Sequence, residues 1–242
     1  MFGFLQGKGK AAAAEEVPPL NKRWDPELPR EVEVTADWSH LLADGPEAAC
    51  VQRVLDLDAF TQQTLTPAEC ETLVAEAERV GFGRTGYPKA YRGNLRLIAT
   101  DAALAAALWG RIAPHIPATQ TDEAGAQWDA CGLNECFRLA KYFPGDEFGA
   151  HCDAAFARSD AERSMYTVNI YLNGGFSGGA TRFYGGNGGR DSRTPIHSVQ
   201  PAPGLACMFR QPPEQAYLHD GERLHTHVKY LLRTDVMYRR RE

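Results

Sequence analysis

The sequence contains no apolar run near the roughly 20 residues that a membrane-spanning helix requires. Its start, MFGFLQGKGKAAAA, places lysines after a short apolar stretch and never builds the apolar centre of a secretory signal. The six cysteines are scattered, with no CxxC pair and no dense framework. These absences predict a protein without a membrane segment, in a reduced state inside the cell, most simply in the cytoplasm.

A strongly basic surface is also missing, because the formal net charge is −5 and the isoelectric point is near 5.8. No basic stripe with interleaved aromatic residues is evident, so nucleic acid is not expected as a partner. The 242 residues, 43% hydrophobic and 24% charged, suit one large domain or one domain with a tail. The sequence does not indicate an oligomeric state.

Residues 1–48 differ from the rest of the chain. The patch KGKAAAAEE is followed by several prolines, and hydrophobic periodicity is weak. This pattern predicts an N-terminal tail, partly mobile or laid across the domain, with one short strand at 31–35. The folded domain is then expected over residues 49–242.

Two helices are predicted in the first half of that domain. Thr66-Pro67-Ala68-Glu69 combines a capping residue, a proline at the first helical position and a capping-box glutamate, and Gly81 ends the helix. Leu104, Leu108, Trp109 and Ile112 recur at helical spacing and predict a second helix over 101–115. A first strand is expected at 54–60, on Val54, Leu55, Leu57 and Phe60. The segment 83–97, rich in Gly, Tyr and Arg, is interpreted as a loop that borders a site.

The second half is typical of a β structure, because short apolar runs alternate with glycines. Strands are predicted at 135–143, 165–172, 181–184, 197–199, 205–209 and 228–238. Helices followed by many short strands indicate a mainly β, helix-supported (α+β) antiparallel sandwich or jelly roll, with its core at about 134–240.

His151-Cys152-Asp153 is the first candidate for chemistry. Residues two apart in an extended segment point to one face, so both outer side chains could reach one ion, and Cys152 should point away as a packing residue. An imidazole nitrogen and a carboxylate oxygen suit Fe(II). Alone the pair is a weak signal, and a solvated loop would then be the better explanation.

Support comes from the C-terminal region, where His219 precedes Lys229 by ten residues. Lys229 and Arg233 share one face of a predicted strand, and a buried cation requires an anionic partner. Either of them could hold a buried carboxylate. Alternatively, both could be ordinary charges facing solvent on an edge strand.

The ordered motifs of this half resemble those of the prolyl 4-hydroxylase-like 2-oxoglutarate/Fe(II)-dependent oxygenases. The resemblance covers about 134–238 and is carried by RLAKYFPG (138–145), FGAHCD (148–153), YLN (171–173), GGATRF (178–183), PAPG (201–204) and His219 with Lys229. Their common order and spacing are far more specific than any single motif.

The resemblance implies a double-stranded β-helix (jelly-roll, cupin-like) core with iron at its mouth. His151, Asp153 and His219 match the metal ligands and catalytic centre of the family. Lys229 matches the basic residue that binds the distal carboxylate of 2-oxoglutarate, with Arg233 as the second choice. Tyr142 and Tyr171 match tyrosines around the cosubstrate, and Thr181 is either a lining residue or a core threonine.

His225 and His227 form a competing alternating pair for the second histidine ligand. The resemblance favours His219, because its turn and its ten-residue step to Lys229 both match the family pattern. The other two are therefore expected at the pocket rim or on the surface.

The implied reaction couples oxidative decarboxylation of 2-oxoglutarate by O2 to hydroxylation of a C–H bond, releasing succinate and CO2. Fe(II) and 2-oxoglutarate are the expected cofactor and cosubstrate, with ascorbate as an optional reductant. A prolyl or other amino-acid side chain of a peptide or protein is the first substrate class, and a free amino acid or another small molecule is the alternative. A metal-binding jelly-roll sensor without turnover and a purely structural β-sandwich are the alternatives from other classes.

Overall fold

The computed structural model describes residues 28–43, 45–46, 51–54, 58–185, 194–213 and 217–242. Most of the predicted tail, and Leu55 and Leu57 of the first predicted strand, lie outside these residues. Within them, strands predominate over helices. Neither α-helix in the described part of the chain is long and apolar enough to cross a lipid bilayer.

In the described part of the chain, twelve strands belong to a larger sheet and four to a smaller one. The larger sheet contains β1 (Val32–Thr35), β2 (Val51–Arg53), β3 (Ala59–Gln63), β4 (Gly83–Arg84), β5 (Leu95–Thr100), β6 (Thr119–Thr121), β7 (Gln127–Leu133), β8 (Cys136–Tyr142), β10 (Ala157–Ser159), β11 (Glu162–Tyr171), β14 (Leu205–Arg210) and β16 (Lys229–Arg240). The smaller sheet contains β9 (Phe148–His151), β12 (Thr181–Tyr184), β13 (Pro195–Val199) and β15 (His219–Gly221). The helical elements are α2 (Pro67–Val80), α3 (Ala102–Ile112) and two 3-10 turns, Ser39–Leu41 and Ala113–His115.

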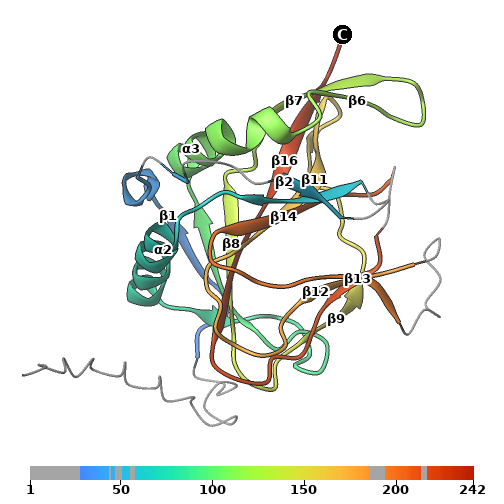
Figure 1. Cartoon of the computed structure of the whole chain (residues 1–242). Coiled ribbons are helices and arrows are strands. Elements are labelled where there is room, and N and C mark those ends of the chain that lie inside the picture. The colour runs from blue at the N-terminus through green and yellow to red at the C-terminus, as the bar shows by residue number, and fades with distance from the viewer. Residues whose placement is uncertain (1–27, 44, 47–50, 55–57, 186–193, 214–216) are drawn as a thin grey trace, which may run out of the picture.

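The two sheets face each other, and the helices cover the opposite face of the larger one (Figure 1). The order β1-β5-β8-β16-β11-β14-β3-β2 is antiparallel except for the parallel pair β1 and β5, and the smaller sheet runs β13-β12-β15-β9. Phe183 and Val199 of the smaller sheet pack against Tyr171, Cys207 and Phe209 of the larger sheet. This arrangement confirms the predicted mainly β, helix-supported jelly roll.

β16 divides its side chains between the two faces of the larger sheet. Its even positions, including Tyr230, Leu232 and Val236, enter the main hydrophobic core beneath the helices. Its odd positions, including Lys229 and Arg233, line the space between the sheets. The predicted common face of these two cations is therefore confirmed, and that face points into the interior.

Both predicted helices are present. Thr66 caps α2 with the predicted capping box, Pro67 begins the helix and Gly81 ends it. Asp101 caps α3 by accepting a hydrogen bond from the Leu104 backbone N–H. The apolar sides of both helices enter the main core, because their leucines recur at helical spacing.

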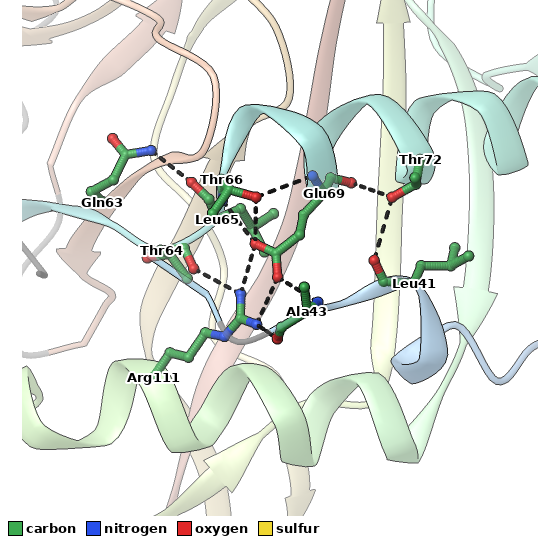
Figure 2. Close-up of polar contacts among 9 residues, drawn as sticks. All are labelled: Leu41, Ala43, Gln63, Thr64, Leu65, Thr66, Glu69, Thr72 and Arg111. Atoms are coloured by element: carbon green, nitrogen blue, oxygen red, sulfur yellow. Dashed lines mark hydrogen bonds and ion pairs between the residues drawn. The ribbon is translucent and has the colours of Figure 1, made fainter. Parts of the chain in front are cut away.

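Glu69 connects three segments of the fold (Figure 2). Its buried carboxylate accepts hydrogen bonds from the backbone N–H groups of Thr66 and Ala43, both at 2.8 Å. Arg111 of α3 donates to both carboxylate oxygens, at 2.8 and 3.1 Å. Burial alone would raise the pKa of Glu69, but these hydrogen bonds hold it below its usual value. The network therefore fixes α2, α3 and the segment at Ala43 relative to one another.

We expect Arg111→Ala to lower the free energy of unfolding by about 3 kcal/mol, because it leaves the buried Glu69 carboxylate without its cation. The matched control is Arg79→Ala, since Arg79 pairs with Glu76 on the exposed side of α2. The control should cost much less, because an ion pair exposed to solvent contributes little to stability. Urea unfolding of the two full-length variants measures the difference, and equal losses would contradict the role given to Arg111.

Three sequence interpretations need correction. The segment 83–97 is not wholly a loop, because its ends form β4 and the start of β5, where Leu95 and Leu97 are buried and Arg96 between them faces the other side. Of the described residues in the first strand predicted at 54–60, only Ala59 and Phe60 lie in a strand, β3, while the buried Val54 follows the end of β2. The strand-rich half also begins before residue 134, because β6 and β7 precede the first strand that was predicted there. The short strand expected at 31–35 is present as β1.

Candidate metal centre and adjoining pocket

His151, Asp153 and His219 meet between the two sheets. His151 ends β9 and His219 begins β15, and the two residues are direct partners in the smaller sheet. Asp153 follows two residues after His151, with its carboxylate oxygens 3.5 Å from His151 Nε2 and 3.8 Å from His219 Nε2. The three candidate ligand atoms lie within 4.8 Å of one another, the one such group found among the described residues.

Both imidazole rings are oriented by backbone carbonyl groups. His151 Nδ1 donates to the Gly149 carbonyl oxygen at 2.9 Å, and His219 Nδ1 donates to that of Tyr217 at 3.0 Å. In this tautomer each Nε2 is the nitrogen available to a metal, and it is also the ring nitrogen that lies near the Asp153 carboxylate. Burial lowers the pKa of His219 to about 4, so its ring is neutral near neutral pH, which is the form that binds a metal.

Asp153 is held as a carboxylate although it is buried. Burial acts to raise its pKa, but Arg233, with Nη2 3.2 Å from Oδ1, and the two histidines hold the pKa well below the usual range. Thr167 donates to Oδ2 at 2.7 Å. Gln211 in turn donates to Thr167 Oγ1 and to Asp235, both at 2.9 Å. A second layer of hydrogen bonds therefore fixes the carboxylate.

Two imidazoles and one ionised carboxylate on one side of a space are the donor set typical of non-haem Fe(II) enzymes. The residues present therefore fit the expected metal. His225 and His227 are exposed, which agrees with their expected place at the rim or surface. Cys152 is also exposed, so the packing role expected for it is wrong.

Lys229 lies in the same pocket as the three candidate ligands. It is only 5% exposed, and its ammonium group donates to the Gly179 carbonyl oxygen and lies over the rings of Tyr142 and Tyr171, at 5.5 and 5.4 Å. No carboxylate among the described residues forms an ion pair with it. Burial lowers the pKa of Lys229 to about 8. Such a cation is suited to receive an anionic ligand.

Arg233 differs from Lys229 because it already has anionic partners. Its guanidinium lies 3.2 Å from Asp153 and 3.6 Å from Asp235. Its principal effect within the described residues is therefore to stabilise the ionised form of Asp153.

The remaining predicted residues border the cavity near Lys229. Tyr142 and Thr181 line it, and the Tyr171 hydroxyl donates to Thr181 Oγ1 at 2.6 Å. The turn before Thr181 requires glycine, because Gly178 has φ +75° and an added Cβ would lie 2.1 Å from the Arg223 carbonyl oxygen. The GG pair of the sequence thus brings the Gly179 carbonyl to Lys229.

Sequence reasoning missed the residues that support Asp153, namely Thr167, Gln211 and Asp235. One signal was available, since Thr167 and Asn169 interrupt the otherwise apolar strand MYTVNIY at alternate positions. Alternate polar residues within a buried strand indicate a polar space on one face.

Comparison with known proteins agrees with this geometry. Residues 137–234 match the model of the 2OG-Fe(II) oxygenase superfamily. A Pseudomonas putida prolyl-4-hydroxylase is similar in structure, with 20% identity and a TM-score of 0.51, over 77% of this chain and 95% of that one. A Trichoplax adhaerens prolyl hydroxylase, solved with a hypoxia inducible factor peptide fragment, has 14% identity and a TM-score of 0.52, over 75% and 84% of the two chains. These structures share the double-stranded β-helix fold. No curated protein sequence matches the chain.

Proposed function

We propose that this chain is a 2-oxoglutarate-dependent dioxygenase of the 2OG-Fe(II) oxygenase superfamily, and that it hydroxylates a C–H bond of an amino-acid side chain and releases succinate and CO2. One observation carries the proposal. The candidate metal ligands share a pocket with Lys229, a buried cation without a carboxylate partner among the described residues. A metal site alone would suit a sensor, whereas a metal site beside an anion site suits an enzyme with an acidic cosubstrate.

Each residue has a separate task in this proposal. His151, Asp153 and His219 hold Fe(II), which when bound supplies the redox chemistry that joins O2 cleavage to decarboxylation. Lys229 binds the distal carboxylate of 2-oxoglutarate and so orients its 2-oxo acid end toward the metal ligands. Thr181 offers a hydroxyl beside that carboxylate.

Aromatic rings shield the histidines from water. Phe148 stacks on His151 with ring centroids 3.8 Å apart. Phe209 packs edge-on against His219 at 4.7 Å, and Phe183 lies 5.9 Å from the same ring. Excluding water strengthens the electrostatic interactions in the site and limits side reactions of the cosubstrate.

A prolyl side chain is the first substrate to test, because the solved structures that share the fold are named prolyl hydroxylases. The protein is purified without oxygen, loaded with Fe(II) and 2-oxoglutarate, and exposed to O2. We expect succinate to form at a basal rate and to increase with peptides or free amino acids, one of which gains one oxygen atom by mass spectrometry. Metal binding without succinate under every condition would instead indicate a sensor.

A further inference from the structure

A second hollow, of about 370 Å³, adjoins the metal site and has arginines in its wall. His151 and Asp153 border it, so a molecule in the hollow lies next to the candidate metal ligands. Four guanidinium groups line it, those of Arg92, Arg96, Arg138 and Arg233. The carboxylates that line it are Asp153 and Asp235.

The sheet places three of these arginines together. Arg138 of β8 is the direct partner of Arg233 on β16 and of Ile98 on β5. Arg96 precedes Ile98 by two residues, so its side chain leaves the same face of the sheet. Like charges on directly opposed strand positions destabilise a sheet. Their presence here therefore needs a compensating partner.

The protein supplies only part of that compensation. Arg96 pairs with Glu31, and Arg138 lies 3.7 Å from Asp235, which is also 3.6 Å from Arg233. Burial, together with the charges of Arg138 and Arg233, holds the pKa of Arg96 below its usual value.

Arg92 has no carboxylate partner among the described residues. It is 8% exposed, its Nε donates to the Asn94 side chain at 3.0 Å, and its guanidinium lies over the Phe148 ring at 4.4 Å. Its guanidinium also lies 5.6 Å from the Tyr87 ring, and a buried cation held by a neutral amide and two rings leaves donors for an anionic ligand.

The metal and the cosubstrate would not balance these charges. In the proposed function Asp153 is committed to Fe(II), and the distal carboxylate of 2-oxoglutarate is committed to Lys229. Among the described residues, the carboxylates that then remain for the four guanidinium groups are Asp235 and Glu31, which leaves two positive charges beside the position where a substrate must lie.

We propose that the substrate carries a carboxylate, which Arg92 and Arg138 bind while the C–H bond to be hydroxylated points toward the metal site. The inference rests on the proposed function and specifies its substrate class. Guanidinium groups bind carboxylates through paired parallel hydrogen bonds, which fixes the orientation of the substrate as well as its affinity. Tyr87, Tyr91 and Phe156, which are 46%, 38% and 40% exposed, offer an aromatic rim for the rest of the molecule.

The carboxylate could belong to an acidic side chain of a peptide or to a free acid, and two arms distinguish these sources. The first arm uses pools of capped peptides that have a randomised central residue. Pools in which Asp or Glu flanks this residue are compared to matched pools in which Asn or Gln flanks it. The second compares the free amino acids with their C-terminal amides. Succinate above the basal rate, and incorporation of one oxygen atom, are measured with the Fe(II)-loaded full chain.

In one of the arms we expect the carboxylate members to stimulate succinate formation at least about tenfold more than their isosteric amides. Arg138→Gln and Arg92→Gln should each reduce this preference at least about tenfold, and Arg138→Lys should restore part of it. Arg79→Gln, on the exposed side of α2, is the matched control and should keep the basal rate and the preference. Circular dichroism checks that each variant is folded. The comparison of acids with amides uses the wild-type protein, so it does not depend on the folding of any variant.

Equal stimulation by acids and amides would overturn the inference, and so would a basal reaction that no carboxylate member stimulates. A preference that survives both glutamine substitutions would overturn the assignment of Arg92 and Arg138. Each of these results leaves the basal formation of succinate in place. Failure of the proposed function differs, because no succinate would then form with or without any pool.

Discussion

Asp153→Ala should form no succinate above background, a loss of at least about a thousandfold in turnover. The substitution removes one of the three candidate metal ligands and the anionic one among them, and it leaves Arg233 facing two imidazoles. Both effects weaken cation binding. Anaerobic equilibrium dialysis with Fe(II) tests this directly, because it reports metal affinity independently of turnover.

Two further variants separate ligation from packing. Asp153→Asn conserves the volume of the side chain but removes its charge, so we expect it to resemble Asp153→Ala. Thr167→Val keeps the carboxylate and removes only the hydrogen bond to Oδ2, so metal affinity should fall about 10- to 100-fold while turnover persists at saturating Fe(II). Asp153→Asn with nearly normal metal binding and turnover would refute the assignment of Asp153 as a ligand.

The proximity of the three candidate ligands was predictable because the relevant constraints are local or lie at fixed spacing. His151 and Asp153 are two residues apart in an extended segment. His219 and Lys229 are ten residues apart and begin two successive strands, β15 and β16. The capping of α2 was equally local, because a helix start depends on four consecutive residues. The two-residue period of β16 placed Lys229 and Arg233 on one face.

What the sequence could not supply were contacts between strands far apart in the chain. Gln211 is 44 residues from Thr167, and Arg138 is 97 residues from Asp235, so their contacts depend on sheet order and register. β9 and β15 are also too short for a recognisable alternating pattern, with four and three residues. The hollow lined by arginines likewise depends on β5, β8 and β16 being neighbours in the larger sheet.

Lys229→Ala should raise the KM for 2-oxoglutarate between about 30-fold and a few thousandfold. Removing one partner of a buried charge pair costs about 2 to 5 kcal/mol, and each 1.4 kcal/mol corresponds to a factor of ten. Arg233→Ala is the matched comparison, because Arg233 leaves the same face of β16 but is already paired with Asp153 and Asp235. We expect that variant to change the KM for 2-oxoglutarate only slightly and to weaken Fe(II) binding instead. Initial rates of succinate formation at saturating Fe(II) give the KM for 2-oxoglutarate of each variant. Anaerobic equilibrium dialysis gives its affinity for Fe(II).

The pH dependence provides an independent check on Lys229. Because burial lowers its pKa to about 8, the ammonium group is protonated below that pH and progressively neutral above it. The KM for 2-oxoglutarate should therefore rise about tenfold per pH unit above pH 8 in the wild type. In Lys229→Arg the rise should disappear, because guanidinium stays protonated throughout this range. An identical rise in both proteins would assign the titration to another group.

A result in which only Arg233→Ala raises the KM for 2-oxoglutarate would show that Arg233 binds the distal carboxylate. Lys229 would then be a buried cation held by the Gly179 carbonyl and two aromatic rings, with no anionic ligand to explain it. The charge of the adjoining hollow would also change, because one of its four arginines would be neutralised by the cosubstrate. The assignment of the cosubstrate anchor and the charge expected of the substrate are thus linked. Measuring the KM for 2-oxoglutarate in the Lys229 and Arg233 variants constrains both.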